Sequence, residues 1–219
     1  MKPFTSLLTA VLLSAASLSA CGGSENRMSI QEQTEKRFQL NPHPTKAYRI
    51  KIKINDAPGP LKLMGDMDVG YLADNCSYII NKLEGATAKP EKDLQTKIQQ
   101  IGQNEYETVI FLDAIQDEDY FGNGVCHWKP YGFSTLFKAT GKLEETGFSI
   151  GDIIENLIEK RTITKYYWKG GYPYYKNDDG SIYDNSITDD GVLQQSLNMY
   201  TDEQRKNLFN VIISIEEIK

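Results

Sequence analysis

Residues 48–54 alternate strictly between apolar and charged side chains. The apolar positions are Tyr48, Ile50, Ile52 and Ile54, and the charged positions between them are Arg49, Lys51 and Lys53. Because successive side chains of a strand point to opposite faces, this period of two predicts a β-strand with one buried face and one basic face in water. Two prolines and a glycine within 55–60 end the strand. The most regular segment of the chain therefore belongs to a sheet that is covered on one side.

Four further segments favour strands, namely 67–71, 106–112, 125–140 and 209–215. Pro130 interrupts the third of these and predicts a bend or a sheet edge. Glu105 and Glu107 are expected opposite the basic face of the first strand, where opposite charges support pairing. Helical periodicity is weak: 150–158 and 202–208 favour short helices, and a short helix around 29–38 has few apolar positions to support it. Many short strands with turn signals between them predict an all-β fold, a single antiparallel β-sandwich domain over 46–219.

The N-terminus has the layout of a secretory signal peptide. Lys2 is a minimal positive region, residues 7–16 are an apolar run, and small residues lead to Cys21. The run is about ten residues long, whereas a membrane span needs about 20. Residues 18–21, Leu-Ser-Ala-Cys, resemble the lipobox of bacterial lipoproteins. This resemblance implies that residues 1–20 are removed and that Cys21 carries the lipid; the alternative is an ordinary cleaved signal with a cysteine nearby.

Residues 21–45 are polar and mixed in charge, which is typical of a flexible, lipid-anchored tether that lifts a domain off the membrane. The residue after Cys21 is Gly22 and not an aspartate, so the protein lacks the residue that would keep it from reaching the outer membrane. We therefore expect an outer-membrane lipoprotein that faces the periplasm and touches the membrane through its lipid anchor only.

The formal net charge of −6 makes nucleic acid a poor partner, since binding it requires a basic face. Cys76 and Cys126 remain after Cys21, and in an oxidising compartment such a pair predicts a disulfide. A zinc site is the competing interpretation. It lacks ligands, because His43 and His127 are the only histidines and there is no Cys-x-x-Cys. No cofactor and no metal site are expected.

The chain has no good candidate for nucleophilic catalysis. His127 adjoins Cys126, but neighbours on a strand face opposite sides, which excludes a direct Cys–His dyad. There is no Gly-x-Ser-x-Gly motif. Because Cys126 and Trp128 share a face, the disulfide is expected to pack near an indole. We expect no catalytic residues and no enzymatic activity.

Two segments are candidates for binding a partner. The first is the acidic run Asp117, Glu118 and Asp119, followed by Tyr120. It suits an electrostatic patch for a basic partner, a calcium site, a glycosidase acid–base pair or a plain solvated loop. Sequence does not choose among these.

The second segment is the densest aromatic stretch, 166–183, which includes Tyr172, Tyr174 and Tyr175. Tyrosine-rich loops make strong protein-binding surfaces, because each ring offers a large area at low entropic cost. A long hairpin with tyrosines paired across it is the structural alternative. The expected fold thus includes a long aromatic-rich loop or hairpin.

Three segments resemble the small lipoproteins encoded beside type VI secretion lipase effectors, namely 51–60 (KIKINDAPGP), 117–128 (DEDYFGNGVCHW) and, more loosely, 208–215 (LFNVIISI). Cys76 lies upstream in the expected place, and Asn123 is a small departure from the pattern. The resemblance implies an immunity protein whose partner is the cognate secreted phospholipase or lipase, with no catalytic residues to transfer. The alternative is a ligand-binding or structural envelope lipoprotein. A deep apolar pocket would indicate a ligand-binding protein, whereas protruding loops would indicate an inhibitor.

Overall fold

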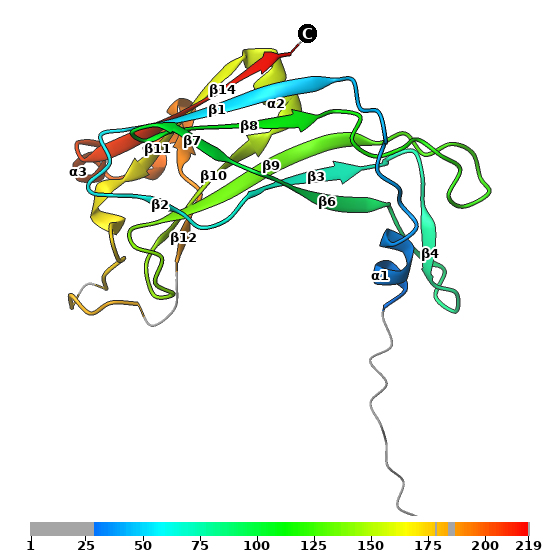
Figure 1. Ribbon diagram of the computed structural model, residues 1–219. Coiled ribbons are helices and arrows are strands. Elements are labelled where there is room, and N and C mark those ends of the chain that lie inside the picture. Colours follow the sequence, from blue (N-terminus) through cyan, green and yellow to red (C-terminus); the bar gives the residue numbers. More distant parts are fainter. Residues whose placement is uncertain (1–28, 178, 184–186, 219) are drawn as a thin grey trace, which may run out of the picture.

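The computed structural model describes residues 29–177, 179–183 and 187–218. In this part of the chain two β-sheets stack face to face (Figure 1). The first sheet has the strand order β13 (Val192–Leu193), β11 (Thr162–Trp168), β14 (Leu208–Glu217), β1 (Ala47–Asn55), β8 (Glu105–Phe111), β7 (Gln99–Gly102). The second has the order β12 (Thr188–Asp189), β10 (Gly147–Ile153), β9 (Lys129–Lys138), β3 (Met67–Leu72), β6 (Glu91–Thr96), with β2 (Lys62–Leu63) beside β9. The predicted all-β sandwich is confirmed.

The first sheet is built on β1, which pairs antiparallel with β14 and β8. The register places Lys53 opposite Glu105, and their side chains form an ion pair of 2.8 Å. Arg49 lies 3.7 Å from Glu107 and 2.9 Å from Glu216 on the same outer face. The predicted pairing of charges across these strands is therefore confirmed, and the opposite face of β1 is free to enter the core.

The second sheet departs from expectation in two places. Residues 150–158 do not form one helix, because β10 continues to Ile153 and α2 (Ile154–Lys160) begins only after it. The sheet is also not wholly antiparallel, since β12 pairs parallel to β10. Pro130 sits opposite Tyr71, where the register of β3 and β9 shifts. A bulge removes a ladder bond, so a proline fits there within a central strand.

The core between the sheets is apolar and aromatic. Phe148 contacts the rings of Tyr167 and Phe209 edge-on, and those two rings stack with centroids 5.1 Å apart. Two buried tyrosines also join the layers by hydrogen bonds. Tyr71 donates to the carbonyl of Phe111 at 2.7 Å, and Tyr167 donates to that of Ser149 at 2.8 Å. Each buried hydroxyl is thereby satisfied, and the two sheets are held in one alignment.

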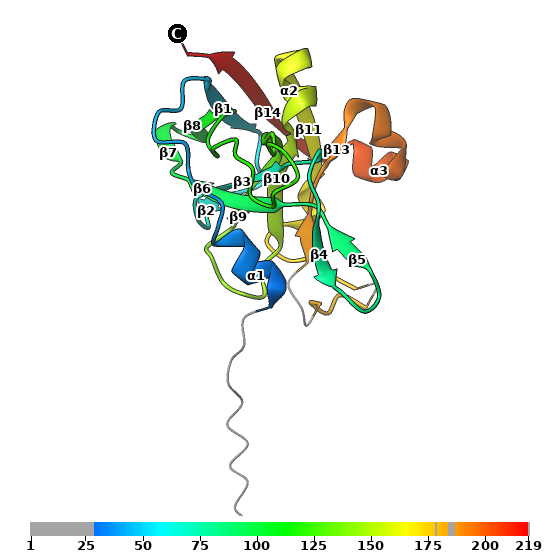
Figure 2. The same cartoon turned by 90° about the vertical axis from the view of Figure 1, so that its right-hand side faces the viewer.

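The expected flexible tether is wrong from residue 29 onward. Ser29 caps α1 (Ile30–Glu35), which lies on the opposite side of the sandwich from α2 (Figure 2). Phe38 is only 5% exposed, and Leu40 bridges to Ile115. The domain therefore begins earlier than residue 46, because Phe38 completes its core. Cys21 and the predicted signal peptide lie outside the described residues. None of the helices described is long and apolar enough to cross a membrane.

Candidate functional site

A disulfide between Cys76 and Cys126 builds one end of the sandwich. The two sulfur atoms are bonded at 2.03 Å, which confirms the predicted bridge between the chain after β3 and the chain before β9. Asn75 strengthens the link, since its side chain donates to the carbonyl of Val125 at 2.8 Å and accepts from the backbone N–H of His127 at 2.9 Å. We call residues 73–90 and 113–128 together the disulfide end. They include the hairpin of β4 (Tyr78–Asn81) and β5 (Ala86–Ala88).

An aromatic cluster supports the disulfide end from beneath. Phe38 contacts the indole of Trp128 with centroids 4.7 Å apart and Tyr120 at 5.2 Å. Tyr78 of the hairpin stacks on Phe121 at 5.5 Å. Aromatic pairs at these distances are worth about 0.5–1.5 kcal/mol each beyond the area they bury. Trp128 and Cys126 belong to the same buried core, and the stacking of Tyr78 on Phe121 fixes the hairpin against the loop.

The acidic run within this end is a structured turn. The Asp119 carboxylate accepts the N–H groups of Phe121, Gly122 and Asn123, with the shortest contact 2.7 Å. Desolvation alone would raise the pKa of Asp119, but these N–H groups and that of Gly124 outweigh it, so the pKa is lowered. Asp119 is thus used to hold the loop and is a poor choice for a partner contact.

Asp117 also has a structural role. Its carboxylate accepts from the backbone N–H of Trp128 at 2.9 Å and lies 2.8 Å from Nδ1 of His127. The His127 side chain is 69% exposed, whereas Cys126 is fully buried; both precede β9, so they are not part of the strand that the sequence predicted from residue 125. Glu118 pairs with Cys126 through its backbone, which leaves its side chain exposed to solvent. Of the three acids, Glu118 is the one best placed to meet a partner.

Tyr120 closes the loop through its hydroxyl, which donates to the carbonyl of Gln116 at 2.7 Å. Within the described part of the chain, no group of three or more His, Cys, Asp and Glu side chains is placed to hold a metal ion.

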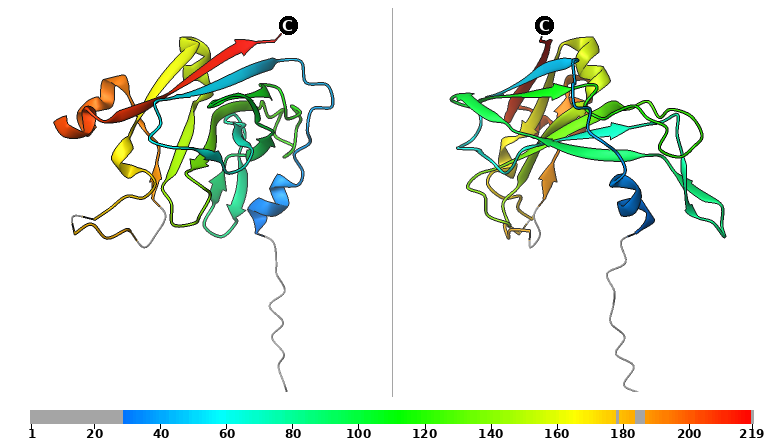
Figure 3. Two further views of the ribbon diagram at one scale, coloured as in Figure 1. Left: turned by 60° about the vertical axis from the view of Figure 1, so that its left-hand side comes forward. Right: turned by 45° about the vertical axis from the view of Figure 1, so that its right-hand side comes forward.

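The aromatic segment differs from the projecting loop that the sequence suggested. Its first three residues, 166–168, belong to β11. Tyr172 donates to the carbonyl of Pro60 at 3.0 Å, and Tyr175 donates to the Asp189 carboxylate at 2.9 Å. Tyr174 is half-buried. The chain leaves the sandwich only beyond these tyrosines, at the opposite end from the acidic loop (Figure 1, Figure 3). The two expected binding segments therefore do not form one patch.

A cleft of about 500 Å³, lined by both polar and apolar side chains, opens between β9–β10 of the second sheet and β11–β13 of the first. Lys165 reaches into it and donates to the carbonyl of Gly151 at 2.9 Å. Burial lowers the pKa of the Lys165 ammonium, and the carboxylates of Asp152, Asp190 and Asp189 oppose that shift. Such a cleft can bind a ligand or side chain that carries both donors and acceptors. The sequence analysis did not predict this cleft. The alternation along β11 could have indicated it, because Lys165 lies on the same strand face as the buried Ile163 and Tyr167.

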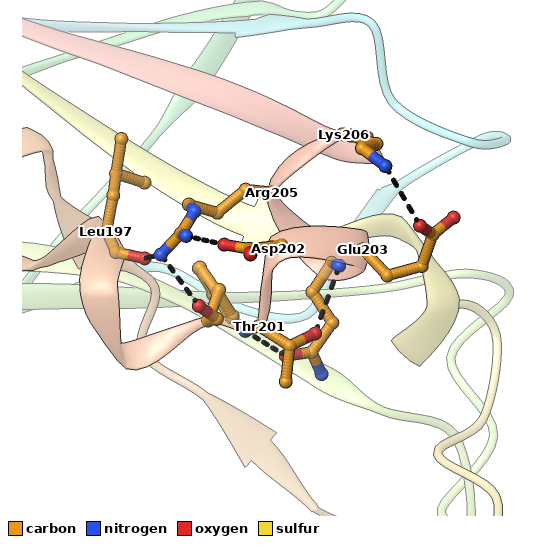
Figure 4. Close-up of polar contacts among 8 residues, drawn as sticks. Leu197, Thr201, Asp202, Glu203, Arg205 and Lys206 are labelled. Carbon is orange, nitrogen blue, oxygen red and sulfur yellow. Dashed lines mark hydrogen bonds and ion pairs between the residues drawn. The ribbon is translucent and has the colours of Figure 1, made fainter.

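One wall of this cleft is η2 (Gln194–Met199), which contributes Ser196 and Met199. Figure 4 shows how Arg205 of α3 (Asp202–Arg205) fixes this wall. Its guanidinium donates to the carbonyls of Leu197 and Tyr200 and pairs with Asp202. The short helix expected at 202–208 is thus confirmed as far as Arg205, and it buttresses the cleft.

A second, more apolar groove of about 590 Å³ lies between α2 and the start of β9. Its apolar lining comes from Leu112, Trp128, Pro130, Ile154 and Ile158. Lys129 stands at the rim and pairs with Asp74 at 2.8 Å. This groove is the one described feature that suits an apolar ligand.

No protein-family model, no curated protein and no solved structure matches the chain.

Proposed function

We propose that this protein is a periplasm-facing lipoprotein that binds and neutralises a secreted phospholipase or lipase of a type VI secretion system. It would act as a stoichiometric immunity protein and not as an enzyme. Beside the sequence resemblance, the observation that carries the proposal is the rigid construction of the disulfide end. The loop 113–128 projects from the sandwich there (Figure 1), and a disulfide, an aromatic cluster and the Asp119 turn hold its shape.

A loop that is ordered before binding gains affinity, because little conformational entropy is lost in the complex. The loop also carries the exposed Glu118 and Val125, which is 46% exposed. A loop that exposes both an acidic and an apolar side chain suits a basic rim around a lipid-binding cleft. The charge would act mainly on the association rate, and the apolar contact on the lifetime of the complex.

Lipidation of Cys21 is the first prediction. The full-length protein, expressed in bacteria and labelled with a radioactive or clickable fatty acid, should incorporate the label. Cys21→Ala should abolish it, because the thiol is the acceptor, whereas Cys76→Ala should leave it unchanged. A wild-type chain without label, or a labelled Cys21→Ala chain, contradicts the lipoprotein assignment.

Complex formation is the second prediction. The purified mature protein should bind the lipase encoded next to it in one-to-one proportion and suppress its hydrolysis of phospholipid. Glu118→Lys should slow association several-fold and flatten its dependence on salt, since steering acts through long-range charge.

The matched control is Glu144→Lys, which makes the same charge change in the exposed loop between β9 and β10. It should leave both rates unchanged. If no complex forms at micromolar concentration and the lipase stays fully active, the immunity proposal is wrong. The apolar groove beside α2 then favours a ligand-binding envelope lipoprotein, which displacement of a fluorescent fatty acid from the wild-type protein would identify.

A further inference from the structure

Several loop tips on one side of the sandwich expose large apolar side chains. Leu83, at the tip of the β4–β5 hairpin, is 100% exposed, and Leu143, between β9 and β10, is 82% exposed. Ile182 and Tyr183, between β11 and β12, are 44% and 43% exposed. Figure 1, Figure 2 and Figure 3 show the β4–β5 hairpin, the β9–β10 connection and the described part of the β11–β12 connection reaching toward the same side of the molecule. We call this side the tip face. Single exposed leucines are ordinary, whereas apolar tips gathered on one side indicate a contact surface.

The hairpin tip is held in a fixed shape. The Asn81 side chain accepts the N–H groups of Leu83 and Glu84 at 3.0 and 3.4 Å. Gly85 adopts φ of +66°, which closes the turn without a side-chain clash. Ile79 and Ile80, exposed by 53% and 39%, extend the apolar surface up the strand. The turn therefore holds Leu83 in a fixed position in which its side chain faces the solvent.

Different hydrogen bonds hold the tip of the β9–β10 connection in a fixed shape. The buried Glu145 carboxylate accepts the N–H groups of Thr140, Gly141 and Lys142. Lys138 donates from inside the loop to the carbonyl of Leu143 at 2.8 Å. Both tips carry the order lysine, leucine, glutamate, in Lys82-Leu83-Glu84 and Lys142-Leu143-Glu144. A leucine flanked by a long lysine suits the border between acyl chains and head groups, where the ammonium reaches phosphate.

The N-terminal end of the described chain lies on the same side. α1 starts on the tip face in the ribbon views of Figure 1, Figure 2 and Figure 3, so Ser29 lies on that side. Eight residues from Cys21 to Ser29 span at most about 29 Å when fully extended. A lipid on Cys21 would thus keep the tip face within that distance of the bilayer.

We propose that the tip face rests on the lipid bilayer, with Leu83 and Leu143 entering the interfacial region. The inference rests on the lipid-anchor part of the proposed function and needs no partner protein. Acyl anchoring supplies the membrane affinity, and the tips fix the orientation. The acidic loop 113–128, at the right-hand end in Figure 1, then stays beside the membrane and open to an incoming protein.

The test is to place a tryptophan at each tip of the lipidated, mature protein. Leu83→Trp and Leu143→Trp alter exposed side chains only. The protein is reconstituted into vesicles of phosphatidylethanolamine and phosphatidylglycerol, with and without doxyl-labelled lipid, and the emission of the unsubstituted protein is subtracted. The matched control is Ile101→Trp, because Ile101 is 50% exposed on β7, which lies away from the tips (Figure 1).

Tryptophan at positions 83 and 143 should shift its emission to the blue and be quenched several-fold more than tryptophan at position 101. Equal quenching at all three positions, in protein that floats with the vesicles, overturns the orientation while leaving the anchor and the immunity proposal intact. A protein that does not float contradicts both the anchor and this inference. Inhibition of the lipase is measured separately in detergent. A failure of the immunity proposal can thus be distinguished from a failure of the proposed membrane orientation.

Discussion

Replacing Cys76 and Cys126 together by alanine is expected to lower the free energy of unfolding by about 4 kcal/mol. The bridge closes a loop of 50 residues, and the chain-entropy model assigns a loop of that length about this stabilisation. Cys126 is also fully buried against the aromatic cluster, so its loss removes packing as well. The effect is large because one covalent bond restrains β3, β4 and the start of β9 at once.

Urea unfolding of the purified mature protein, followed by tryptophan fluorescence, measures this change. Wild-type protein unfolded in the presence of a reductant should lose a similar amount, which separates the bond from the packing of the sulfur atoms. The variant should also bind the lipase more weakly, since the loop 113–128 loses its restraint. A difference below about 1 kcal/mol would show that the aromatic cluster alone holds the disulfide end.

Glu145→Ala is expected to cost about 2–4 kcal/mol at neutral pH. The Glu145 carboxylate is 1% exposed and accepts three backbone N–H groups and the hydroxyl of Thr140. Deleting it leaves these donors without their acceptor inside the loop. The donors belong to exposed or half-buried residues that water can reach in part, so their combined cost is well below the sum of the about 1–3 kcal/mol that each buried unsatisfied donor would cost. Glu145→Gln should cost less, because one acceptor oxygen remains. The exposed neighbour provides the control, and Glu144→Ala should change stability by less than about 0.5 kcal/mol.

The loss should also depend on pH. Desolvation tends to raise the pKa of Glu145, but the hydrogen bonds from Thr140, Gly141 and Lys142 outweigh it, so the pKa in the folded state is lowered. A lowered pKa means that the carboxylate stabilises the fold above its ordinary titration range. That contribution disappears as the pH falls through the lowered value. Unfolding measured at pH 7 and pH 3 should show a smaller gap between wild type and Glu145→Ala at pH 3. An equal gap would mean that the charge is irrelevant.

The local sequence pattern was enough to predict the strands that bury only one face. The alternation in 48–54 and 209–215 gave β1 and β14, because burial on one side imposes a period of two whatever the rest of the fold. The pairing of Cys76 with Cys126 was accessible for a similar reason, since two cysteines allow one bridge.

Other features depended on contacts between distant segments. Asp117 and Asp119 read as a charged patch in sequence, yet they bind backbone N–H groups that only the folded loop presents to them. Tyr172 and Tyr175 read as exposed anchors, yet the fold brings the carbonyl of Pro60 and the Asp189 carboxylate to their hydroxyls.

The sequence by itself thus predicted the strands with a clear period of two and the disulfide, because these depend on local periodicity and on count. It missed β10, whose residues read as part of a helix. The export signal proposed for this protein also rests on order along the chain alone. Tertiary structure alone decided which polar groups are consumed by the fold and which remain on its surface. Tertiary contacts bury Phe38 in the core and direct the Lys165 side chain into a cleft. They also bring the loop tips that carry Leu83 and Leu143 to one side of the molecule. The physical reason is that burial and hydrogen-bond satisfaction are properties of segments brought together in space, and no single segment carries that information.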